Sequence, residues 1–183
     1  GLFSHRKLSN GEIEIDDLKR WHKKELQGKP EFHIISNDSG GEVTPSVLRG
    51  KIDQYKPDFV VVDYLQLMSP NQKADNETVR MKNLSRELKL MAISEEVPII
   101  AISSATPDDV TKLDTVPTLG QTAWSRQIAY DADFVLALGR GVNSDVIECV
   151  FRKNRNGYMG EFLVQVDFDR GWYKYKPLND EDA

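Results

Sequence analysis

The feature that most constrains the fold is an apolar, β-branched run that ends abruptly in one carboxylate, Phe59-Val60-Val61-Val62-Asp63. Such a run predicts a buried strand that delivers Asp63 to one edge of a sheet. An acid at that place can hold Mg²⁺, because this ion takes only one or two protein carboxylates and completes its octahedron with water and phosphate. Apolar runs that end in Asp also occur in sheets that bind no nucleotide. The spacing alone therefore leaves a magnesium site and a plain strand end equally open.

Length and charge limit the class of protein. The chain has 183 residues and no break in composition, so we expect one domain. No stretch is apolar for long enough to cross a bilayer, and the single cysteine, Cys149, favours a reducing, intracellular compartment. The net charge of −5 argues against a broadly basic DNA clamp, because phosphate binding depends on Lys and Arg. Any nucleic-acid site must be local.

Apolar periodicity alternates between helices and strands along most of the chain. We expect helices at 15–27, 45–56, 76–96 and 123–130, and strands at 32–35, 59–63, 99–102 and 134–138. This alternation predicts an α/β fold with a mostly parallel sheet flanked by helices. Ligands of such sheets bind beyond the carboxyl ends of the strands, where the loops 69–75 and 104–121 begin.

The last third of the chain changes character. Two strand-like runs, 146–151 and 162–168, flank Asn156-Gly157, which predicts an antiparallel β-hairpin, and a closing strand is expected at 172–175. The acidic tail 179–183 is expected to be disordered.

The hairpin carries a cluster of cations near its tip. Strand alternation puts Lys153 and Arg155 on the same side, so that both can reach one anionic group such as a phosphate. A cation that a neighbouring subunit presents can stabilise the charge of phosphoryl transfer. A solvated charged turn is the plainer alternative, and this cluster by itself favours it.

Four segments taken together carry a family resemblance. They are Val60 to Met68 with its Asp-Tyr-Leu-Gln-Leu-Met, the strand 98–103, Asp131-Ala132-Asp133, and Lys153-Asn154-Arg155-Asn156-Gly157. In this order and spacing the chain resembles the C-terminal ATPase domain of DnaB-type replicative DNA helicases, from about residue 31 to 175. The resemblance implies a RecA-like fold over 1–178, with the antiparallel hairpin as a C-terminal extension.

The resemblance also implies a role for single residues. Asp63 looks like the Walker B acid that acts on Mg²⁺, and Ser104 stands where the family usually has a glutamine that senses the γ-phosphate of ATP. Lys153 and Arg155 look like the pair that reaches the γ-phosphate bound by the adjacent subunit of a homohexameric ring. The two loops correspond to those that face single-stranded DNA, and Lys73 and Lys112 are their only cations.

The implied function is that of a motor domain that couples ATP hydrolysis to translocation on single-stranded DNA and to duplex unwinding. It would work in the cytoplasm of a bacterial or phage-infected cell, with a primase or a helicase loader as further partners. Three departures stand against a full transfer of activity. The chain has no Gly-x-x-x-x-Gly-Lys-Ser/Thr phosphate loop, it reads Ser103-Ser104 instead of Ser-Gln, and 122–127 lacks the usual Arg and Glu, with Arg126 a candidate substitute.

These departures lead to two expectations and two alternatives. We expect the chain to be a fragment that begins downstream of its phosphate loop and that cannot hydrolyse ATP alone. The first alternative is a catalytically inactive RecA-like module that serves binding or assembly in DNA replication or recombination. The second is an unrelated α/β protein, which a structure without Asp63 and Ser104 at one sheet edge would favour.

Overall fold

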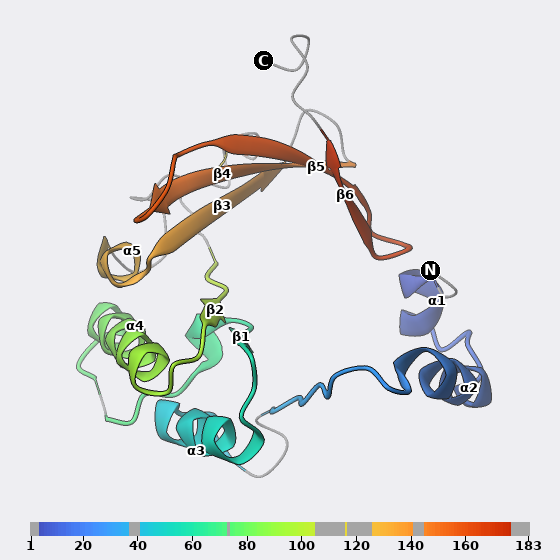
Figure 1. The fold of residues 1–183 in the computed structure, drawn as a ribbon, viewed down its shortest axis with the longest axis horizontal. Helices are drawn as coiled ribbons and strands as arrows, with labels where there is room; N and C mark the ends of the chain where they lie inside the picture. The colour runs from blue at the N-terminus through green and yellow to red at the C-terminus, as the bar shows by residue number, and fades with distance from the viewer. Residues whose placement is uncertain are drawn as a thin grey trace. The chain divides into compact units, whose positions relative to one another are not determined.

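The computed structural model of the chain describes residues 4–36, 41–72, 74–104, 116, 126–140 and 145–176. These fall into two compact units (Figure 1). The central unit comprises Ile35–Gly139 and Cys149–Glu161, and the terminal unit comprises Gly1–Ile34, Arg140–Glu148 and Phe162–Ala183. Both units draw on segments that are distant in sequence, so the division marks no boundary between consecutive domains. The expected single domain at 1–178 stays a prediction.

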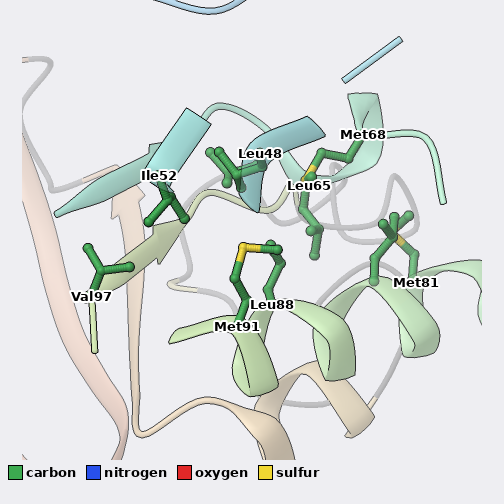
Figure 2. Close-up of a cluster of buried hydrophobic side chains, with 10 residues drawn as sticks. Leu48, Ile52, Leu65, Met68, Met81, Leu88, Met91 and Val97 are labelled. Atoms are coloured by element: carbon green, nitrogen blue, oxygen red, sulfur yellow. The ribbon is translucent and has the colours of Figure 1, made fainter. Parts of the chain in front are cut away.

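The central unit is built on a parallel pair of strands. β1 (Val60–Val62) pairs with β2 (Ile99–Ala101), with Val61 opposite Ile100. Helices α3 (Pro45–Tyr55) and α4 (Glu77–Ser94) supply most of the core beside this pair. Figure 2 shows the core side chains of α3, α4 and the short 3₁₀ helix η2 (Leu65–Leu67) pointing toward one another. The buried cluster contains Leu48, Ile52, Val62, Leu65, Met68, Met81, Leu84, Leu88, Met91 and Val97.

Local capping explains where the two large helices begin. The Thr44 hydroxyl accepts a hydrogen bond from the Val47 amide at 3.2 Å, and Pro45 occupies the first helical position of α3. The Asn76 side chain accepts from the Val79 amide at 2.9 Å and so caps α4. Both helices were expected from the sequence and are confirmed.

The second sheet has four strands in the order β3-β4-β5-β6. They are β3 (Phe134–Arg140), β4 (Val146–Asn154), β5 (Glu161–Asp167) and β6 (Trp172–Lys176), and α5 (Arg126–Asp131) precedes them. β5 and β6 are antiparallel, with Val164 opposite Tyr175. The expected α/β class with a C-terminal antiparallel extension is confirmed. β3 is hydrogen-bonded to β4 in this sheet, whereas its apolar sequence suggested a place beside the parallel strands.

The terminal unit contains two N-terminal helices, α1 (His5–Ser9) and α2 (Ile15–Leu26). α2 was expected, whereas α1 was not. The start of α1 is tied to Asp169, which accepts from the His5 amide and from the Ser4 hydroxyl, both at 2.6 Å. No helix among the described residues is both long and apolar enough to span a bilayer.

The strand predicted at 32–35 is wrong. Residues 31–36 have no regular secondary structure, and the side chains of Phe32 and Ile34 are 84% and 80% exposed. An apolar, β-prone segment becomes a strand only when another strand offers it hydrogen bonds, and no described strand pairs with this one. The expected disordered tail, 179–183, lies outside the described residues.

Candidate functional site

Asp63 and Ser104 lie at the same edge of the parallel sheet. Asp63 directly follows β1, and Ser103 and Ser104 follow β2, where Val62 is opposite Ala101. Pairing continues past the strands, because the Ile102 amide donates to the Val62 carbonyl at 2.9 Å and the Leu65 amide to the Ile102 carbonyl at 2.8 Å. The arrangement that would have favoured an unrelated α/β protein is therefore not found.

The Asp63 carboxylate is exposed at this edge. Among the described residues no group of three or more His, Cys, Asp or Glu side chains could hold a metal ion by itself. A single exposed carboxylate nevertheless fits Mg²⁺, which keeps most of its ligands as water and phosphate oxygens. The donor set at this edge is suited to a metal that arrives with a nucleotide.

Gln66 connects the two strand ends. Its side-chain amide donates to the Ser103 hydroxyl at 3.0 Å, and its side-chain carbonyl is buried without a hydrogen-bond partner among the described residues. Gln66 belongs to η2 and falls inside the Asp-Tyr-Leu-Gln-Leu-Met motif, but no sequence signal distinguishes it as a site residue. The contact links the segment after Asp63 with the segment before Ser104.

Arg80 of α4 also holds η2 in place, through hydrogen bonds to its backbone. Its guanidinium donates to the Met68 carbonyl at 2.7 Å and to the Gln66 carbonyl at 3.0 Å, and it also pairs with Glu77. The hydrogen bond from Arg80 lowers the pKa of the Glu77 carboxyl. The chain that follows Asp63 is thus held between the end of β2 and the first turns of α4.

The two predicted hairpin cations both contact the segment that runs from the carboxyl end of α5 to the start of β3. The Lys153 ammonium donates to the carbonyls of Ala129 and Tyr130, at 2.7 and 2.9 Å, near the carboxyl end of α5. The Arg155 amide donates to the Asp133 carbonyl at 3.0 Å, and its guanidinium lies 3.3 Å from the Asp133 carboxylate. Burial, and then repulsion by Arg155, lower the pKa of Lys153.

Asp133 also binds α4. The Lys89 ammonium donates to its second carboxylate oxygen at 2.5 Å, and this hydrogen bond is the main reason that the pKa of Asp133 is lowered. The nearby Asp131 is buried and accepts from the Ser85 hydroxyl at 2.9 Å and from the Gln127 amide at 3.2 Å. Asp131 and Asp133 were expected only as part of a family motif, and no sequence signal predicted Lys89 or Ser85 as their partners.

The predicted residues therefore form two separate clusters. Asp63 and Ser104 share the sheet edge, and Lys153 and Arg155 share the α5–β3 segment, but no hydrogen bond or ion pair joins the two clusters within the described ranges. The expected DNA-contacting residues Lys73 and Lys112 lie outside the described residues, as does the side chain of Arg126.

The matches of this sequence to known proteins all point to the same family. Residues 2–177 match the model of a protein family that is described as "DnaB-like helicase C terminal domain". A probable replicative DNA helicase of Trieres chinensis is 31% identical over 95% of this chain and 41% of its own length. The replicative DNA helicase DnaB of Pasteurella multocida is 35% identical over 72% of this chain and 30% of its own length. The chain thus spans less than half the length of these curated relatives.

Solved structures agree with the sequence matches. The ATPase domain of G40P superposes with a TM-score of 0.79 at 23% identity, over 97% of this chain and 66% of that one. A DnaB-like replicative helicase, studied with its primase interactions, superposes with a TM-score of 0.67 at 27% identity, over 72% of this chain and 35% of that one. The first match confirms the RecA-like fold expected from the sequence. Fold and sequence together show that the chain belongs to the family of DnaB-like helicase C-terminal domains.

Proposed function

We propose that this chain is part of a ring-shaped replicative DNA helicase that couples ATP hydrolysis to translocation on single-stranded DNA and to duplex unwinding. The observation that carries the proposal is the shared sheet edge, where Asp63 at the end of β1 lies beside Ser103-Ser104 at the end of β2. Ligands of parallel α/β sheets bind at such an edge. Because the chain belongs to a family of helicase domains, we propose that this ligand is ATP.

At this edge Asp63 would hold Mg²⁺, directly or through a water, and Ser104 would face the phosphates of ATP. Bound Mg²⁺ would neutralise charge that develops on the phosphates during transfer. Two sets of contacts support this assignment. The Gln66–Ser103 hydrogen bond joins the segments that follow β1 and β2, and the hydrogen bonds from Arg80 restrict the backbone of η2, which follows Asp63. Ser104 replaces a longer glutamine, so we expect it to bind the γ-phosphate weakly or through water.

Lys153 and Arg155 would act on the ATP of the adjacent subunit. An ammonium has three N–H donors, of which Lys153 uses two on backbone carbonyls, and a guanidinium has five. Donors therefore remain for a phosphate while both side chains stay anchored. The Arg155 side chain is 50% exposed, which leaves it accessible to another subunit.

The trans role is tested by mixing subunits of the complete gene product. Arg155→Ala subunits, added to wild-type rings, should poison ATP hydrolysis in more than their own proportion, because each removes a cation from a neighbour's site. Loss of such a cation lowers phosphoryl transfer by a factor on the order of a thousand. Arg170→Ala is the matched control, since Arg170 lies in the turn between β5 and β6 and pairs with Asp167. Activity that falls only in proportion to the added Arg155→Ala subunit would show that the trans role is wrong.

The 183 residues lack a phosphate loop, so we propose that hydrolysis needs one supplied from outside this sequence. The purified chain should show no magnesium-dependent turnover of ATP, measured as phosphate release. Turnover by this chain alone would contradict the proposal. The inactive-module alternative is supported only by the departures at Ser104 and 122–127, whereas the named relatives are replicative helicases.

DNA and protein partners complete the proposal. The loops 69–75 and 104–121, with Lys73 and Lys112, would follow the phosphate backbone of single-stranded DNA without reading its bases. One structural neighbour is described with its interactions with primase, which makes a primase a candidate partner besides a helicase loader. A cytoplasmic location is consistent with these partners.

Lys73→Ala and Lys112→Ala should each weaken binding of single-stranded DNA and reduce its salt dependence, measured by fluorescence anisotropy.

A further inference from the structure

Arg155 is held by Asp133 at two points. Its amide donates to the Asp133 carbonyl at 3.0 Å, and its guanidinium lies 3.3 Å from one Asp133 carboxylate oxygen. Asp133 comes directly before β3 and Arg155 directly after β4, and these two strands are neighbours in the sheet. The backbone contact fixes the position of the Arg155 backbone, from which the side chain extends. The side-chain contact fixes the direction of its guanidinium.

The second oxygen of Asp133 is occupied from another element. The ammonium of Lys89 on α4 binds it at 2.5 Å, with the Lys89 side chain only 21% exposed. Asp133 therefore cannot rotate toward Arg155 or away from it without giving up the bond to α4. The Asp133 carboxylate is therefore fixed in direction toward Arg155. A carboxylate that contacted only Arg155 could rotate together with the guanidinium.

Asp133 is also the acid that pairs directly with two of the three local cations, Lys89 and Arg155. Lys89, Lys153 and Arg155 all act on its carboxyl, and Arg155 and Lys89 repel the Lys153 ammonium. Without the Asp133 charge, three cations would face one another, and the exposed Arg155 is the one best able to turn away into solvent. Asp131, the other acid nearby, also attracts the Lys153 ammonium, but it pairs with Arg86 at 3.8 Å and forms no ion pair with Lys89 or Arg155 among the described residues.

We propose that Asp133 is the positioning residue for Arg155, with Lys89 holding Asp133 in place. Asp133 touches neither nucleotide nor metal in this scheme; it fixes the direction from which the guanidinium reaches the neighbour's phosphates. The inference rests on the proposed trans role of Arg155. It predicts that Asp133 matters for hydrolysis only through Arg155.

A double-mutant cycle in the complete ring-forming protein tests this dependence. Asp133→Asn keeps the size and an acceptor oxygen but removes the charge, and should lower kcat by about tenfold to a hundredfold, the cost of misplacing a reacting group by about 1 Å. KM for ATP should change by less than about twofold, because Arg155 acts in the transition state. Asp133→Asn combined with Arg155→Ala should be no slower than Arg155→Ala alone, and Asp133→Glu should recover part of the rate.

The controls separate this inference from the function on which it rests. Asp167→Asn removes another aspartate that pairs with an arginine and caps its amide, and should leave kcat unchanged. Thermal melting of each variant shows that it is folded; if Asp133→Asn does not fold, Asp133→Glu, which keeps the charge but moves it, is compared alone and in combination with Arg155→Ala. Multiplicative losses in the double variant would overturn the positioning role while ATP hydrolysis stands. A wild-type ring without magnesium-dependent turnover would instead overturn the proposed function, and this inference with it.

Discussion

Asp133 carries its charge beside three cations, and this setting makes its contribution to stability depend on pH. Its pKa lies below the ordinary value of 3.8, first because of the Lys89 hydrogen bond and then because of nearby positive charge. A carboxyl whose pKa is lower in the folded than in the unfolded chain stabilises the fold above the unfolded pKa. That stabilisation is lost as the pH falls through the folded pKa.

Lys89→Met should therefore destabilise the protein at pH 7, and this effect should become smaller as the pH is lowered toward 2 and the Asp133 carboxylate takes up a proton. The Asp133 side chain is 42% exposed, so we expect a difference of about 1 kcal/mol or less. Urea unfolding of wild type and variant over this pH range measures it. Lys82→Met, at an exposed position of the same helix, is the control. A destabilisation by Lys89→Met that is the same at both pH values would contradict the assigned ion pair.

Gly139 gives a second prediction at the scale of one residue. A Cβ atom there would lie 2.7 Å from the Val116 Cγ2 and 2.9 Å from its Cα, so backbone would have to move. Gly139→Ala should lower the free energy of unfolding by about 1–3 kcal/mol. A Cβ on Gly160 would meet nothing within 4 Å, so Gly160→Ala is the matched control in the same denaturation experiment. Equal stability of the two variants would contradict the close approach of Val116.

Single residues show what the sequence could predict of the site. Asp63, Lys153 and Arg155 were named because each belongs to a short motif that can be recognised locally, and Ser104 was named from the family resemblance alone. Gln66 and Ser103 are 37 positions apart, and Lys89 and Asp133 are 44 apart. Ordinary polar residues at such separations have no spacing that identifies them as partners. The sequence could therefore propose candidate residues, whose roles stay predictions, but it could not predict the contacts that hold them.

At the scale of elements, the longer helices could be predicted because their signals are local, whereas α1 was missed and the strand predicted at 32–35 is wrong. The spacing of Met81, Leu84, Leu88 and Met91 indicated α4 to within two residues at either end. The apolar segment 32–35 carries an equally clear strand pattern but lacks a partner strand among the described residues. Pairing is a property of two segments, and one segment's sequence does not reveal it.

The packing of α4 gives a prediction for this scale. Met81 is fully buried in the core that α4 shares with α3 and η2. Met81→Ala should lower the free energy of unfolding by about 2–5 kcal/mol, through lost apolar contact and the cavity that remains. Met159, which is 58% exposed, provides the control Met159→Ala, with an expected change below about 0.5 kcal/mol. Chemical denaturation compares the two, and a small effect at Met81 would show that α4 does not pack as described.

At the scale of the whole molecule, the described residues cover one face of the parallel sheet and leave the other face open. Val60, Val62 and Ile99 pack with the core beside α3 and α4. On the alternate positions, Phe59, Val61, Ile100 and Ile102 are 56%, 50%, 55% and 46% exposed. A continuous apolar run predicts a strand buried on both faces, but it does not say which segment covers each. Among the described residues only one face is covered, and an exposed apolar patch of this kind binds apolar molecules.

The open face predicts how the purified chain behaves in solution. A dye such as ANS, which fluoresces when it leaves water, should bind the native chain through Val61 and Ile100, which lie opposite each other in the register of β1 and β2. Val61→Thr combined with Ile100→Thr should reduce the fluorescence, because a hydroxyl replaces a methyl group of Val61 and the ethyl group of Ile100 at the centre of the patch, while both side chains stay β-branched, which suits a strand. Val47→Thr with Val79→Thr, at exposed valines of α3 and α4, should leave it unchanged, because these side chains lie outside the patch. A titration with dye under native conditions measures the difference. Equal fluorescence of the two double variants would mean that the dye binds elsewhere and that the second face of the sheet is covered in solution.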